Sequence, residues 1–116
     1  MIKIKKRDGS VTDFNIEKIE SAIEKAFIQE HKFFTKDIIE MLALRVTAEF
    51  NSKIEGDGTV DVETIQDSVE VVLIQAGYID VAKSYMVYRK QHQNLRQISQ
   101  TNIDYKNVID NYLKIN

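Results

Sequence analysis

The chain has 116 residues, of which 43% are hydrophobic and 29% charged, and it carries a formal net charge of −2. This composition is typical of one folded domain; it excludes a large multidomain enzyme, a disordered chain and, because cysteine is absent, disulfides, thiolate metal sites and thiol catalysis. The slightly acidic balance disfavours nucleic acid as the main partner, and the lack of an apolar run of roughly 18 residues or of a signal peptide predicts a cytoplasmic location without membrane insertion.

The N-terminal residues predict a β-hairpin. Residues 2–5 alternate Ile with Lys, the period of two that is typical of a half-buried strand, and residues 11–14 resume apolar character. Asp8-Gly9 predicts the turn, because glycine reaches positive φ without a Cβ clash. The alternation puts Lys6 on the face meant for the core, where an ammonium must reach water or meet an anion. Two interpretations stay open: a sheet edge protected by lysines, or an anion site.

Two amphipathic helices follow, with Asn15 and Thr35 as their expected N-caps. Their apolar residues recur at helical spacing and are expected in the core: Ile16, Ile19, Ile23, Ala26 and Phe27 in the first helix, and Ile38, Ile39, Leu42, Val46 and Phe50 in the second. Lys18 lies off the first stripe, in an opening turn where the helix dipole disfavours a cation. It is therefore either solvated or directed toward a bound anion, whereas the second helix is expected to be architectural.

A glycine-containing loop at residues 55–58 marks a chain reversal, and it lacks the Gly-Lys-Ser/Thr ending of a P-loop. Thr59-Val60 predicts either a short third strand or an extended lead-in. Asp61 is expected to cap a third helix over residues 62–76, which Gly77 ends at C′. The apolar C-terminal half of this helix predicts the most buried helix, and its polar first turn offers N–H groups to an anion.

A fourth helix is expected over residues 79–97. Arg89 and Lys90 are predicted as exposed charges that either complement the helix dipole or reach a phosphate. Residues 1–97 are interpreted as one domain, and residues 98–116 as a linker with a tail helix leading toward a further domain. The expected fold is α+β and mainly helical, with the N-terminal hairpin packed on four helices.

The residue types disfavour catalysis by this chain. His31 and His92 are far apart, and no carboxylate cluster accompanies either at ligand spacing, so neither a metal site nor a nucleophile with its base can be assembled. A set of cations that the fold can gather around a polyphosphate stands out instead: Lys6, Arg7, Lys18, Arg89 and Lys90. Arginine would supply bidentate contacts and lysine point charges, which predicts a nucleotide site without a P-loop.

Four blocks carry a resemblance to a known family: Lys5-Lys6-Arg7-Asp8-Gly9-Ser10, Phe14-Asn15-Ile16-Glu17-Lys18-Ile19, residues 62–70 and residues 81–90. In order and spacing they resemble the ATP-cone domain, which is found at the N-termini of ribonucleotide reductase large subunits and in a bacterial repressor of their genes. The start at Met1, without the repressor's zinc ribbon, resembles the reductases. Residues 105–113 look like the link into the catalytic barrel of the anaerobic (class III) ribonucleoside-triphosphate reductases.

The resemblance implies an allosteric site that senses ATP against dATP, with Mg²⁺ as its companion, and that controls the overall activity of a ribonucleotide reductase. The residues it implies at the nucleotide are Lys5 (through its backbone), Lys6, Arg7, Lys18, Val62, Gln66 and either Arg89 or Lys90. The implied partners are the catalytic domain of the same chain and further copies of the parent enzyme. Two alternatives stay open: the cone of a nucleotide-responsive repressor, and a helical interaction module without a ligand.

Overall fold

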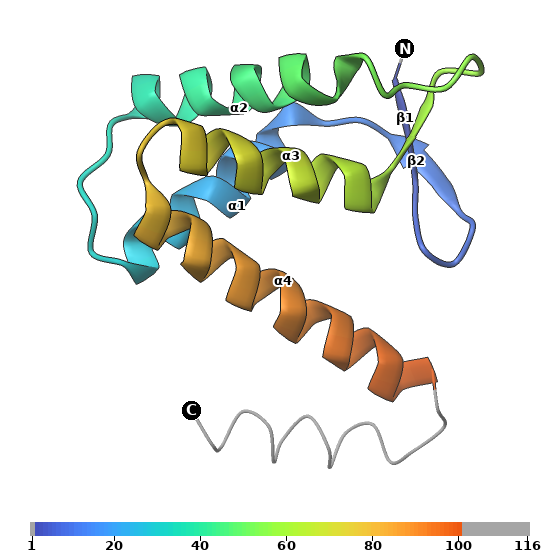
Figure 1. The fold of residues 1–116 in the computed structure, drawn as a ribbon. Helices are drawn as coiled ribbons and strands as arrows, with labels where there is room; N and C mark the ends of the chain where they lie inside the picture. The colour runs from blue at the N-terminus through green and yellow to red at the C-terminus, as the bar shows by residue number, and fades with distance from the viewer. Residues whose placement is uncertain (1, 101–116) are drawn as a thin grey trace. The chain divides into compact units, whose positions relative to one another are not determined.

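The computed structural model describes residues 2–100 of the chain. The elements, in chain order, are β1 (Lys3–Lys5), β2 (Val11–Asp13), α1 (Ile16–Gln29), α2 (Lys36–Asn51), β3 (Thr59–Asp61), α3 (Val62–Gln75) and α4 (Ile79–Gln100) (Figure 1). The predicted class, mainly helical α+β with an N-terminal hairpin, is confirmed, and Thr59-Val60 belongs to a third strand. The tail helix was expected beyond residue 100, outside the described residues, and the domain boundary after residue 97 stays a prediction.

The described part of the chain divides into two units, residues 2–85 and residues 86–100. The first unit holds the sheet, the three helices α1, α2 and α3, and the start of α4. The second unit holds the remainder of α4. No helix within residues 2–100 combines the length and the apolar character needed to cross a membrane.

The sheet has the strand order β2-β1-β3, with β1 in the centre. β1 pairs antiparallel with β2, which places Ile4 opposite Thr12, and parallel with β3, which places Ile4 opposite Val60. β3 then runs directly into α3. Because parallel strands end at the same edge of a sheet, the end of β1 and the beginning of α3 are brought together there.

The β1–β2 hairpin closes through a tight loop at residues 6–10. The N–H of Gly9 donates to the carbonyl of Lys6 at 3.0 Å, and the N–H of Lys6 donates to the carbonyl of Ser10 at 2.8 Å. Gly9 has a φ of 87°, so its predicted role is confirmed. The carboxylate of Asp8 accepts hydrogen bonds from the hydroxyl of Ser10 at 2.6 Å and from its N–H at 2.9 Å. These two hydrogen bonds hold the pKa of Asp8 below its usual value.

The loop that leads into β3, residues 55–59, has the same build. Gly58 has a φ of 84°, and its N–H donates to the carbonyl of Glu55 at 2.9 Å. The carboxylate of Asp57 accepts from the hydroxyl of Thr59 at 2.7 Å and from its N–H at 3.0 Å, which lowers the pKa of Asp57. One five-residue loop geometry therefore occurs twice, at the exit from β1 and at the entry to β3.

Hydrogen bonds confirm the predicted N-caps of α1 and α2. Oδ1 of Asn15 accepts from the N–H two residues later at 2.9 Å, and Oγ1 of Thr35 accepts from the N–H three residues later at 3.2 Å. Gly77 follows α3 with a φ of 88°, as predicted for C′. Asp61 occupies the N-cap of α3, but its side chain makes no capping hydrogen bond.

The core of the first unit lies where α2 packs against both α1 and α3 (Figure 1). Eight residues of the two predicted stripes are buried: Ile19, Ile23, Ala26, Phe27, Ile39, Leu42, Val46 and Phe50. Ile16 and Ile38, at the edges of these stripes, are half-buried. In the apolar C-terminal half of α3, Val69, Val72 and Leu73 are buried, whereas Val71 and Ile74 lie on the outer side and are 38% and 46% exposed.

Candidate functional site

A hollow of about 330 Å³ lies at the edge of the sheet where β1 ends and α3 begins. Its walls come from two stretches of three consecutive residues: Lys5, Lys6 and Arg7 on one side, and Asp61, Val62 and Glu63 on the other. The parallel register, which sets Lys5 opposite Asp61, brings the two stretches together. Three cations face two carboxylates, so the hollow carries one net positive charge.

The first turn of α3 adds a partial positive charge to this hollow. The first N–H groups of an α-helix have no carbonyl partner within the helix, and the helix dipole places its positive end there. Val62 and Glu63 are the first two residues of α3 and also line the hollow. An anion that binds between the lysines and α3 is therefore attracted from both sides.

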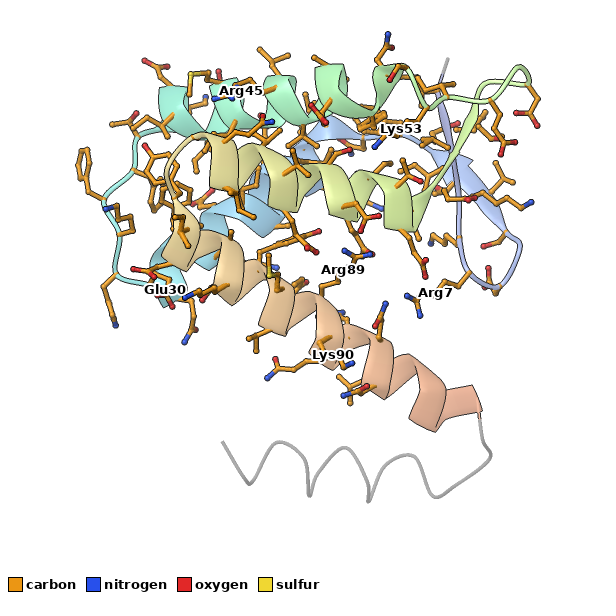
Figure 2. All side chains as sticks on the ribbon, in the orientation of Figure 1. Arg7, Glu30, Arg45, Lys53, Arg89 and Lys90 are labelled. Atoms are coloured by element: carbon orange, nitrogen blue, oxygen red, sulfur yellow. The ribbon has the colours of Figure 1, made fainter. Side chains whose placement is uncertain are left out.

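Arg7, labelled in Figure 2, forms an ion pair with Glu63, which joins the hairpin loop to α3 at the hollow that both residues line. The side chain of Arg7 is 30% exposed, and that of Glu63 is 51% exposed. This contact holds the guanidinium beside the first turn of α3. The ion pair also engages the guanidinium of Arg7, which is the one planar group among the lining cations that can donate two parallel hydrogen bonds.

Lys6 is exposed and begins the hairpin loop, because β1 ends at Lys5. The prediction that Lys6 lies on the core face is therefore wrong: the alternation of a strand stops applying where the chain turns. The expectation of cations gathered at an anion site gains support at this place, since Lys5, Lys6 and Arg7 line one hollow with Val62.

Two further predicted residues lie in the first unit but do not line this hollow. Lys18 is exposed on the first turn of α1, and Gln66 is half-buried on α3, one helical turn after Val62. Contact of Lys18 and of Gln66 with a ligand therefore stays a prediction.

Arg89 and Lys90 belong to the second unit and lie in the middle of α4 (Figure 2). Lys90 is exposed as predicted, whereas Arg89 is half-buried, which corrects the expectation of an exposed charge. The reason is helical spacing, because Arg89 follows the buried Tyr85 by four residues and shares its face. Contact of either residue with a ligand in the first unit stays a prediction.

The sequence did not single out Asp61 or Glu63 as site residues. The parallel pairing of β3 with β1 is the feature that brings them to the lysines, and no local pattern encodes it. The signal that pointed nearest to them was the polar first turn of α3. Across residues 2–100, no group of histidine and carboxylate side chains is arranged to hold a metal ion.

A sequence model of the ATP cone domain matches residues 2–94 of the chain. The chain belongs to the ATP-cone family. The match spans all four blocks that suggested the resemblance, including both walls of the hollow. Lys5, Lys6 and Arg7, the cations that line the hollow, are therefore part of the segment that matches the ATP-cone family.

Similar proteins include three reductases. The alpha subunit of ribonucleoside-diphosphate reductase from Chlamydia pneumoniae is 38% identical over 102 residues, which is 83% of this chain and 10% of the relative. Vitamin B12-dependent ribonucleoside-diphosphate reductases from Mycobacterium tuberculosis (strain CDC 1551 / Oshkosh) and Thermoplasma acidophilum are 36% and 40% identical over 94 and 103 residues. These alignments cover 81% and 84% of the chain, and 13% of each relative. The ATP-cone chain thus spans about a tenth of the length of these relatives.

The relatives bear on the expected reductase class. All three are named as diphosphate reductases, two of them dependent on vitamin B12. The comparisons therefore support the link between this ATP-cone and ribonucleotide reductases, but not the particular likeness to the anaerobic triphosphate reductases that residues 105–113 suggested.

Proposed function

We propose that this ATP-cone is an allosteric nucleotide sensor, which binds ATP and dATP in the hollow between the end of β1 and the start of α3. The observation that supports this most is the parallel register that sets Lys5, Lys6 and Arg7 beside the first turn of α3. A polyphosphate suits this arrangement, because lysine supplies point charges, arginine bidentate hydrogen bonds and the helix start free N–H groups.

The remaining predicted residues complete the proposed site. Val62 offers an apolar surface to the nucleoside, and Gln66, one turn along α3, offers an amide to its polar edge. Lys18 lies beside the nucleotide, and either Arg89 or Lys90 closes the site from α4. The backbone of Lys5 is proposed to contact the base.

Mg²⁺ is proposed to enter with the nucleotide. Mg²⁺ prefers phosphate oxygens and water to a dedicated cage of protein ligands, so the lack of a carboxylate cluster within residues 2–100 is compatible with this route. The carboxylate of Asp61, which lines the hollow, supplies the hard oxygen chemistry that Mg²⁺ accepts.

The proposed role in the parent protein is control of overall reductase activity, with ATP permitting activity and dATP suppressing it. The names of the relatives, and the small share of their length that the chain covers, 10% and 13%, support a large catalytic domain in the same chain. They also favour a reductase over a repressor. Further copies of the parent enzyme are proposed as partners, and a cytoplasmic location suits the nucleotide ligands.

ATP and dATP differ by one 2′-hydroxyl, so the proposed control needs only a small difference in affinity between two states of the protein. A coupling free energy of about 1 to 3 kcal/mol is typical of allosteric proteins and is sufficient here. A hydroxyl supplies such a difference when its loss leaves a buried protein group without a hydrogen bond.

Isothermal titration calorimetry of the 116-residue chain with ATP and with dATP, in the presence of Mg²⁺, tests the proposal. The double variant Lys6→Ala, Arg7→Ala is expected to lose binding of both nucleotides and the rise in melting temperature that ATP gives the wild type. Lys25→Ala, which removes an exposed cation from α1, is the matched control and should bind as the wild type does. Absence of binding by the folded wild type would favour the interaction module without a ligand.

A further inference from the structure

We infer that Glu63 competes with phosphate for Arg7, so that this carboxylate sets the affinity of the ATP-cone for its nucleotide. The inference rests on the proposed nucleotide site and adds to it an exchange of partners. Without a ligand, the guanidinium of Arg7 is bound by Glu63. When a polyphosphate enters, Arg7 releases the carboxylate and binds phosphate oxygens.

The placement of the two side chains supports this exchange. Both line the same hollow, on opposite walls, and their ion pair spans it. A phosphate that binds in this hollow lies within reach of the Arg7 guanidinium, which the ion pair holds there. Since guanidinium forms bidentate hydrogen bonds with carboxylate and with phosphate alike, the two anions compete for one donor.

Because both side chains of the pair are partly exposed, the exchange costs little free energy. Arg7 is 30% exposed and Glu63 is 51% exposed, so the carboxylate regains its hydration once it is released. Ion pairs at such exposure contribute little to stability, and a ligand with several negative charges outcompetes them. The pair therefore lowers the affinity without blocking the hollow.

Asp61 provides a built-in comparison. It lines the same hollow and carries the same charge as Glu63, but the ion pair of Arg7 that crosses the hollow is with Glu63. If Glu63 acted only as a negative charge near the phosphates, removing either carboxylate would strengthen binding to a similar extent. If Glu63 acts by holding Arg7, its removal has the larger effect.

The test measures affinity for ATP with Mg²⁺ in five chains: the wild type, Glu63→Gln, Asp61→Asn, Arg7→Gln and the double variant Arg7→Gln, Glu63→Gln. Glu63→Gln is expected to bind about fivefold more tightly than the wild type, the factor that corresponds to release of an exposed ion pair. Asp61→Asn should change the affinity less. Adding Glu63→Gln to Arg7→Gln should bring little further gain, because the group that was released is no longer present.

A second measurement separates the exchange from nucleotide binding itself. The Nε–Hε signal of Arg7 in the NMR spectrum should differ between the nucleotide-free wild type and Glu63→Gln, and the two signals should converge when inorganic tripolyphosphate is added. Weaker binding by Glu63→Gln, or equal gains in the presence and absence of Arg7, would overturn the inference while nucleotide binding stands. Failure of all five chains to bind would instead overturn the proposed function, and the signal of Arg7 in the wild type and in Glu63→Gln would still report on the ion pair.

Discussion

The ring of Phe14 stands edge-on against the ring of Phe50, with centroids 5.5 Å apart and planes inclined by 71°. Phe14 ends the hairpin, and Phe50 lies near the end of α2 with no exposed surface. This contact ties the small sheet to the helical core. It thereby fixes the edge at which the cations of the hollow are presented.

Phe50→Ala is expected to lower the free energy of unfolding by about 3 to 5 kcal/mol, because it leaves a cavity in the core and removes the ring against which Phe14 packs. Phe33→Ala is the matched control, since Phe33 is 78% exposed and its truncation should change stability by less than about 0.5 kcal/mol. Urea denaturation followed by circular dichroism measures both. Equal losses in the two variants would contradict the assigned core.

Gly9→Ala is expected to destabilise the chain by about 1 to 2 kcal/mol, because Gly9 has a φ of 87°, where a Cβ strains the backbone. No atom lies within 4 Å of an added Cβ, so the effect is conformational rather than steric crowding. Gly56→Ala is the control: its surroundings are equally open, and its φ lies outside the left-handed region. That variant should be neutral or slightly stabilising in the same denaturation experiment.

The hydrogen bonds from Ser10 to Asp8 predict a dependence of stability on pH. The pKa of Asp8 is lower in the folded chain than its usual value near 4, so its contribution is present above about pH 4 and is lost as the pH falls through the folded pKa. In Ser10→Ala, NMR titration should show the pKa of Asp8 moved back toward its usual value. The stability difference between wild type and Ser10→Ala should shrink in acid; a difference that is constant with pH would refute this.

Lys18→Ala tests a proposed contact that lies outside the hollow. If Lys18 lies beside the bound nucleotide, its loss should weaken ATP binding about fivefold in calorimetry, as expected for one partly solvated charge contact. Lys25→Ala, on the same helix, should leave the affinity unchanged. Equal affinities of the two variants would remove Lys18 from the site.

Arg89→Gln and Lys90→Gln decide which of the two neighbouring cations serves the nucleotide. Only the variant that removes a phosphate ligand should lose ATP affinity, whereas a change of general charge would affect both to a similar extent. Calorimetry at low and high salt distinguishes these cases, because a screened, distant charge loses its effect at high salt.

Local patterns predicted most of the elements. The N-caps Asn15 and Thr35, the turn glycine Gly9 and the C′ glycine Gly77 were each predicted from residues within a few positions of one another, and the structure confirms them. These features depend on hydrogen bonds between near neighbours in the chain and on the φ that glycine can adopt. Both follow from the type of residue at one position and can therefore be predicted from the sequence.

The pairing of β3 with β1 escaped prediction, because it joins strands that are separated by two helices. Glu63 was missed as a site residue for the same reason. Lys6 was placed on the wrong face, because periodicity gives the side on which a strand residue lies but not the residue at which the strand stops. The exposure of Val71 was likewise set by tertiary packing, which decides how much of an apolar helix is covered.

The two aspartate-glycine loops carry one further consequence. At their first two positions, the hairpin loop has Lys6 and Arg7, and the loop before β3 has Glu55 and Gly56. The backbone of both loops is set by the next three residues, an aspartate, a glycine and a residue with a hydroxyl group. Charge and shape are thus specified by different positions. An ATP-cone whose hairpin tip carried Glu-Gly in place of Lys6-Arg7 would fold with the same tip geometry and yet repel the anions that the natural tip attracts.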